Sequence, residues 1–143
     1  MRCTPHIPSV LGYTFSANER PADMADPLKH TKAMIVVLAM PDCPACIEYK
    51  PRFEKMVDHF VAHGVPFAYY EPGQAIAKGM IPVLIVDATS TDPNVQQFCD
   101  AHNVDAMPTT ILLTRSIAPQ RIQGSISDDE IYQLLSAAQI ANR

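Results

Sequence analysis

The feature that most constrains the fold is a run of seven apolar residues, MIVVLAM at 34–40, that leads within three positions to the motif C-P-A-C. Such a run is typical of a strand buried on both faces of a parallel or mixed sheet. Apolar residues then recur at helical spacing through residues 43–63; they are Ile47, Phe53, Met56, Val57, Phe60 and Val61. A buried strand that passes directly into a helix predicts an α/β domain, with two cysteines at the junction.

The expected limits of this helix follow from local residue types. Asp42 is of a type that caps helix N-termini, and Pro44 is tolerated in the first turn. Pro51 lies inside the helix and predicts a kink, because proline lacks the backbone N–H. Gly64 predicts the end of the helix.

The rest of the chain supplies further strands and helices. Strands are predicted within 81–88, 111–114 and 117–124, and helices at 92–103 and from the capping box S-x-x-E at Ser127 onward. Residues 65–82 are expected to begin with a strand, VPFAYYE, and to continue as a loop. The order β-α-β-α-β-β-α predicts parallel pairing early in the chain and an antiparallel hairpin late.

Composition narrows the class of protein. A chain of 143 residues with 48% hydrophobic and 18% charged residues suits one globular domain with a sizeable core. The net charge of −4 and the scattered Lys and Arg give no basic surface for nucleic acid. No apolar run reaches the roughly 18 residues of a membrane span. Residues 1–30 hold no apolar segment of the signal-peptide type, so we expect a cytoplasmic protein, in a compartment where thiols are mostly reduced.

The position of the cysteine pair suggests its chemistry. At the start of a helix, unpaired backbone N–H groups and the helix dipole favour an anion, and the thiolate is the attacking species in disulfide exchange. Cys43 would occupy that position. Cys46 follows one turn later and should be less exposed. The spacing therefore predicts an attacking and a resolving thiol.

Two other interpretations of the pair are half of a zinc site and two inert core residues. A zinc site needs two more ligands at similar spacing, and neither Cys3, Cys99 nor the five histidines supply a second close pair. His59 and His63 are spaced i, i+4 and could bind a metal, but a solvated helix face is the better interpretation. The preceding buried strand and the following helix favour the redox pair.

From about residue 32 to 140 the chain resembles the thioredoxin-fold family. The resemblance is carried by MIVVLAM running into CPAC, by Pro51 five residues after the second cysteine, by VDAMPTTILL, and by QGSISDDEIYQLL. It implies an α/β thioredoxin-like fold, a central mixed β-sheet flanked by helices. Residues 32–143 are expected to form this domain, with an insertion at about 65–82. Residues 1–31 are expected to form an irregular N-terminal extension that diverges from the family.

The resemblance also implies substrate-binding residues. Pro108 matches the family's cis-proline, and Met107 precedes it; in the family the backbone of that preceding residue pairs with an incoming peptide beside the cysteines. Pro44 and Ala45 stand between the two cysteines, where the family's dipeptide tunes the redox potential and meets the substrate.

Several positions depart from the family. Asp42 stands where most thioredoxins have Trp, and Val37 stands where they carry a buried Asp that accepts the proton of the resolving thiol. The usual Lys partner is also missing from PVLIV at 82–86. Glu48 lies near the pair but is expected to point to solvent. Resolution of a mixed disulfide by Cys46 is therefore expected to be slow at neutral pH.

These residues predict a thiol–disulfide oxidoreductase, with Cys43 and Cys46 as catalytic residues. The expected reaction is the reduction of disulfide-containing proteins, with a reductase or a small thiol as electron donor. No cofactor, metal, nucleic acid or membrane is expected to take part, and the protein is expected to be a monomer. The alternative is a docking or accessory module of a larger assembly, in which the cysteines are not essential.

Overall fold

The computed structural model describes residues 19–21, 24 and 26–143. Cys3 and most of the expected N-terminal extension therefore lie outside the described residues. The division into an extension and a domain stays a prediction. Within the described residues, a short strand, β1, covers Glu19–Pro21.

A five-stranded mixed sheet forms the centre of the fold, in the order β3-β5-β2-β6-β7. Its strands are β2 (Ala33–Ala39), β3 (Phe67–Tyr69), β5 (Ile81–Asp87), β6 (Thr109–Thr114) and β7 (Gln120–Gln123). Strand β5 pairs in parallel with both β2 and β3, whereas β6 pairs antiparallel with β2 and with β7. The predicted early parallel pairing and late antiparallel hairpin are both confirmed.

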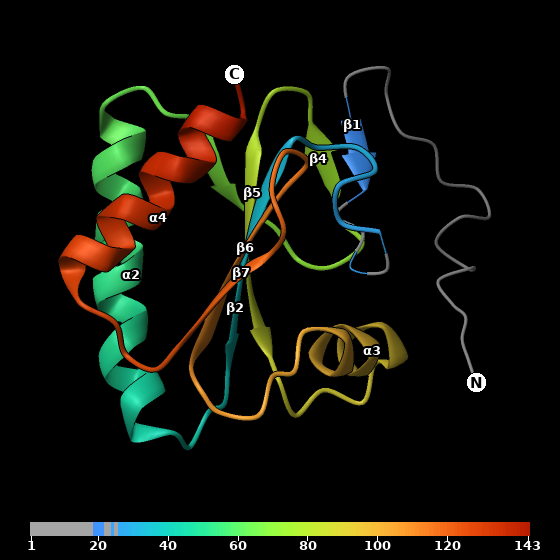
Figure 1. The fold of residues 1–143 in the computed structure, drawn as a ribbon, viewed down its shortest axis with the longest axis vertical. Coiled ribbons are helices and arrows are strands. Elements are labelled where there is room, and N and C mark those ends of the chain that lie inside the picture. Colours follow the sequence, from blue (N-terminus) through green and yellow to red (C-terminus); the bar gives the residue numbers. More distant parts are fainter. Residues whose placement is uncertain (1–18, 22–23, 25) are drawn as a thin grey trace.

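Helices cover the sheet on both faces (Figure 1). Helices α2 (Pro44–Ala62) and α4 (Asp128–Ala141) lie on one side. Helix α3 (Pro93–Ala101) lies on the other side, together with a two-stranded sheet in which β1 pairs with β4 (Ala75–Ala77). The predicted α/β architecture, a central mixed sheet flanked by helices, is confirmed.

Strand β2 is apolar throughout because both of its faces are buried. Ile35 and Val37 belong to the core under α2 and α4. Val36 and Leu38, which point the other way, belong to the core under α3 and the small sheet. The continuous run at 34–40 thus reflects a central strand between two cores.

The N-terminal caps of the helices lie where the sequence predicts them, with one exception. Asp92 caps α3 by accepting the N–H of Asn94 at 2.9 Å, and the capping box of Ser127 and Glu130 opens α4. The prediction for α2 was wrong by one residue. Its N-cap is Cys43, and Asp42 lies one position before it, exposed to solvent.

The apolar face of α2 also differs in part from the prediction. The buried residues of this helix are Cys46, Tyr49, Phe53, Val57 and Phe60, at spacings of three and four. Ile47 is 63% exposed and Val61 is exposed as well, so assigning these two to the core was wrong. Tyr49, three residues after Cys46 on the buried face of α2, packs its ring beside that of Phe53.

The segment 65–82 contains more structure than expected. Its first part forms the edge strand β3, as predicted. The part expected to be a loop contains β4, whose Ile76 is buried in the core on the α3 side. Among the described residues, no helix is long and apolar enough to cross a membrane.

Candidate active site

Cys43 is the residue just before α2, after β2 has ended. The junction of β2 and α2 lies at the lower end of the sheet in Figure 1. Its sulfur accepts the backbone N–H of Cys46 at 3.2 Å, so the side chain itself is the helix cap. The residue is partly exposed. The sulfur therefore lies among the unpaired backbone N–H groups of the first helical turn.

Cys46 is far less accessible, with 4% of its surface exposed. It faces the core side of α2, one turn after Cys43. Burial raises the pKa of the Cys46 thiol, and a hydrogen bond with the side chain of Cys43 raises it further. The two thiols therefore have the unequal exposure that was predicted from their spacing.

The loop before β6 meets this pair. The Met107–Pro108 peptide bond is cis. The Cys43 thiol donates to the Met107 carbonyl oxygen over 3.7 Å, although the two residues are 64 positions apart. The loop is fixed from both sides, because Gly124 donates its N–H to the Pro108 carbonyl at 2.7 Å and the Thr109 hydroxyl donates to the Ala106 carbonyl at 2.6 Å.

The residues between and behind the cysteines differ in exposure. Pro44 and Ala45 form the first turn of α2 and are exposed beside Cys43. Val37 is buried in β2, opposite Ile85 on one side and Thr110 on the other. No carboxylate occupies the Val37 position, so the structure offers no buried base there.

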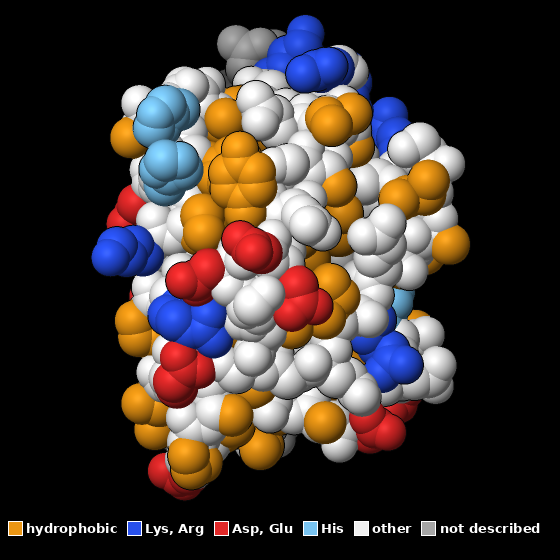
Figure 2. All heavy atoms as spheres, turned by 60° about the vertical axis from the view of Figure 1, so that its left-hand side comes forward, with side chains coloured by type: hydrophobic (Ala, Val, Ile, Leu, Met, Phe, Trp, Pro, Cys, Tyr) orange, Lys and Arg blue, Asp and Glu red, His pale blue; other side chains and the backbone are white. Residues whose placement is uncertain are grey.

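Glu48 points to solvent, as predicted, and its carboxylate is hydrogen-bonded to other side chains. Its carboxylate accepts from the Arg52 guanidinium at 2.5 Å and from the Ser125 hydroxyl. These contacts lower the pKa of Glu48 to about 2. Figure 2 shows acidic side chains gathered around a basic one on the face formed by α2 and α4. A carboxylate held in this way is a poor proton acceptor for a neighbouring thiol.

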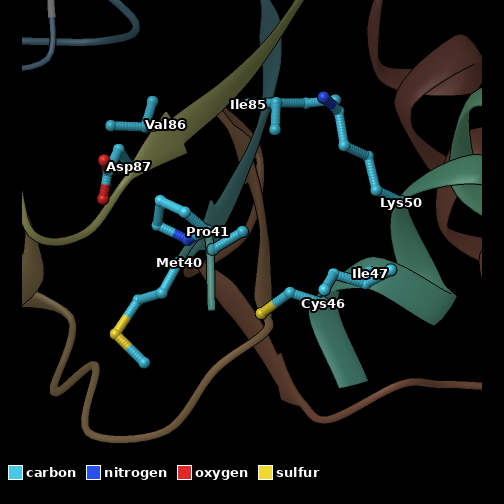
Figure 3. Close-up of a pocket in the computed structure, with 9 residues that line it drawn as sticks. Met40, Pro41, Cys46, Ile47, Lys50, Ile85, Val86 and Asp87 are labelled. Atoms are coloured by element: carbon cyan, nitrogen blue, oxygen red, sulfur yellow. The ribbon is translucent and has the colours of Figure 1, made fainter. Parts of the chain in front are cut away.

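A pocket of about 360 Å³ adjoins Cys46. Its lining comes from the end of β2 and the residues after it, from the first turns of α2 and from the end of β5: Ala39, Met40, Pro41, Cys46, Ile47, Lys50, Ile85, Val86 and Asp87. In Figure 3 the Cys46 side chain points toward Met40 and Pro41, and Lys50 extends toward Ile85. The lining is mainly apolar, with one cation and one anion.

Sequence reasoning missed this pocket. Ile47 was assigned to the core, and Met40 to the buried strand, yet both are exposed and line the pocket. The signal that was available is the spacing of the buried positions of α2: a series that runs through Cys46 and Tyr49 leaves Ile47 outside.

Among the described residues, no three His, Cys, Asp or Glu side chains form a group that could hold a metal ion. His59 and His63 do stack, with ring centroids 4.5 Å apart, and His63 Nδ1 contacts the His59 carbonyl. Cys99 is buried in the core on the α3 side.

Comparison with known proteins shows the fold and little beyond it. No family model matches the chain. No curated protein matches it.

Several solved structures are similar in three dimensions. Chloroplastic thioredoxin z has a TM-score of 0.53 at 13% identity, covering 82% of this chain and 86% of its own. Thioredoxin-2, a component of the protein secretion machinery of the malaria parasite, has a TM-score of 0.52 at 17% identity, covering 77% and 85%. The germline-specific thioredoxin Deadhead of Drosophila melanogaster has a TM-score of 0.50 at 11% identity, covering 74% and 80%.

At such low sequence identities, these similarities support a conclusion about the fold alone. With its mixed sheet, its strand-to-helix junction and its C-x-x-C pair at that junction, this chain has the thioredoxin fold.

Proposed function

We propose that the protein is a thiol–disulfide oxidoreductase that reduces protein disulfides through a reversible Cys43–Cys46 disulfide. The observation that carries the proposal is the position of the Cys43 sulfur. It accepts a helix N-terminal N–H at 3.2 Å and lies 3.7 Å from the Met107 carbonyl. A partly exposed sulfur beside the half-buried backbone of Met107 can meet a substrate disulfide.

The reaction proceeds in two exchanges. The Cys43 thiolate attacks one sulfur of the substrate disulfide; a mixed disulfide forms and one substrate thiolate leaves. Cys46 loses its proton, and its thiolate attacks the Cys43 sulfur. The second substrate thiolate leaves, and the 43–46 disulfide remains. Two electrons pass to the substrate, whose thiolates take up two protons.

Met107, Pro108, Pro44 and Ala45 form the substrate surface around the attacking sulfur. Pro44 and Ala45 are exposed, Met107 is half-buried, and Pro108 is buried beneath the Met107 backbone that it orients. The Met107 carbonyl that faces Cys43 is the backbone group best placed to pair with a substrate peptide. The protein acts as a cytoplasmic monomer, and a reductase or a small thiol returns the pair to the dithiol state.

Reduction of a disulfide-linked peptide, with dithiothreitol as electron donor, tests the proposal. Cys43→Ser is expected to abolish catalysed reduction. Cys46→Ser is expected to accumulate a one-to-one mixed disulfide with the substrate, visible by mass spectrometry. Cys99→Ala, in the core away from the pair, is the matched control and should remain active. Full activity of the Cys43→Ser/Cys46→Ser variant in the cell would favour the docking module instead.

A further inference from the structure

The pocket beside Cys46 is one half of a longer groove. A second pocket, of about 330 Å³, is lined by Lys50, Glu54, Tyr69, Tyr70, Glu71, Gln74, Val83 and Ile85. The two pockets share Lys50 and Ile85. The two pockets therefore adjoin at these two side chains. Together they are here called the α2–β5 groove, which extends from Cys46, between α2 and the sheet, to the edge strand β3.

The two halves of the groove differ in chemistry. The half next to Cys46 exposes the apolar side chains of Met40 and Ile47. The far half is lined by Tyr69, which is exposed at the sheet edge, by the half-buried Tyr70, and by the carboxylates of Glu54 and Glu71. Lys50, at the boundary, is the one basic residue in the lining of either half.

The carboxylates of the far half have no basic partner in the part of the chain that the structure describes. Among the described residues, Glu54 and Glu71 take part in no ion pair; both recorded ion pairs belong to Arg52. Burial raises the pKa of Tyr69, and the charges of Glu54 and Asp58 raise it further, so this end of the groove carries a negative field. Such a site favours a cation, and an exposed tyrosine ring can pack on the aliphatic stem of Lys or Arg.

We propose that the α2–β5 groove binds an extended segment of the substrate protein and selects a basic residue in it. This inference rests on the proposed function, because the groove begins at the redox pair. The apolar half holds an apolar side chain next to the reactive cysteine of the substrate. The far half holds a Lys or Arg side chain between Glu54 and Glu71, over the ring of Tyr69.

The geometry of α2 sets the spacing of the basic residue. Glu54 follows Cys43 by eleven positions along the helix. At about 1.5 Å per helical residue this is roughly 16 Å. An extended peptide advances about 3.3 Å per residue, so the basic side chain belongs about five positions from the substrate cysteine.

Peptide substrates that differ only at this position test the inference. Disulfide-linked peptides carry Lys, Gln or Glu five positions from the reactive cysteine, on its N-terminal or its C-terminal side. In one of the two directions, kcat/KM for the Lys peptide should exceed that for the Glu peptide by about three- to tenfold at low ionic strength. The ratio should fall toward one as salt screens the charges.

Variants then assign the preference to the two carboxylates. In the Glu54→Gln/Glu71→Gln variant the Lys-to-Glu ratio should fall toward one. The control, Asp100→Asn/Asp129→Asn, removes the same charge from exposed positions outside the groove and should keep the ratio. Equal ratios in the two double variants would overturn the assignment to Glu54 and Glu71.

A binding measurement tests whether the groove binds peptides, independently of disulfide reduction. Peptides with Ser in place of the cysteine are titrated into the labelled protein, and the amide resonances of residues 69–74 are followed by NMR. The Lys peptide should shift them and the Glu peptide should not. Normal reduction without a Lys preference, or titrations that leave these resonances unmoved, would overturn the groove but not the redox function. If no peptide is reduced, the proposed function fails, and the titration still decides the groove. Shifts that depend on protein concentration alone would assign the groove to a second copy of the chain.

Discussion

At the scale of single residues, burial separates the two thiols. Cys43 is partly exposed, whereas burial raises the pKa of Cys46 above its ordinary value, and Val37 offers no base behind it. Because only the thiolate attacks, resolution should accelerate by nearly tenfold per pH unit between pH 7 and 8.5. Loading Cys43 with thionitrobenzoate and following its release at each pH measures this step. A rate that is flat over this range would show that another group, Asp42 first, serves as the base.

A base can be added at the same site. Val37→Asp should speed resolution near pH 7 several-fold, because a carboxylate at this position can accept the Cys46 proton. It should also lower the free energy of unfolding by about 2–4 kcal/mol, because the new carboxylate is buried without a partner. Val61→Asp makes the same change at an exposed position of α2 and should alter neither quantity appreciably. Unchanged resolution in Val37→Asp would remove this position from the proton path.

At the scale of elements, one buried hydrogen bond ties α2 to β6. The hydroxyls of Tyr49 and Thr110 lie 2.8 Å apart, and both residues are buried. Tyr49→Phe leaves the Thr110 hydroxyl without this partner and should cost about 1–2 kcal/mol in urea unfolding. Thr110→Val should cost a similar amount, and the double variant less than the sum. Tyr132→Phe, at a ring that is 50% exposed, is the control. Strict additivity would contradict the coupling.

The junction of α2 and α4 depends on Arg52. Besides Glu48, its guanidinium contacts Asp128 Oδ1 at 2.8 Å and the Ile126 carbonyl at 2.9 Å. The pKa of Glu48 is lowered from 4.5 to about 2, so the stability that this contact contributes is complete above about pH 4.5 and is lost as the pH falls toward 2. Arg52→Gln should therefore lose less stability than the natural protein between pH 5 and 2, as followed by thermal unfolding at each pH.

Lys55→Gln, at an exposed cation of the same helix, should follow the natural protein over this range. If the curves of Arg52→Gln and the natural protein run parallel from pH 5 to 2, the Glu48–Arg52 contact contributes nothing to the acid dependence.

At the scale of the whole molecule, the central sheet needs cover on both faces. Helices α2 and α4 supply it on one face; on the other, α3 shares the task with the small β1–β4 sheet, through Ile76. Ile76→Ala should lower the free energy of unfolding by about 2–4 kcal/mol in a single transition, because Ile76 is 1% exposed. Ile140→Ala, at a side chain that is 59% exposed, should change it by less than about 0.5 kcal/mol. A loss at Ile76 no larger than this control would show that the small sheet is peripheral to the fold.

The sequence by itself determined the elements whose causes are local. The run at 34–40 specifies a strand buried on both faces, and the capping box at Ser127 opens α4, because each depends on residues a few positions apart. The C-x-x-C spacing and the helix that follows it placed the two thiols with unequal exposure. The resemblance to a family supplied the loop at Met107 and Pro108, which no local pattern contains.

Only the tertiary structure decided what depends on contacts between distant segments. It placed Met107 against Cys43 across 64 positions, made Cys43 rather than Asp42 the helix cap, and exposed Ile47. It also brought the segment 65–82 alongside α2 and so created the far half of the α2–β5 groove. The position of a side chain within the helical repeat limits which neighbours it can contact. Which face is covered, and by what, is set by the packing of the whole chain.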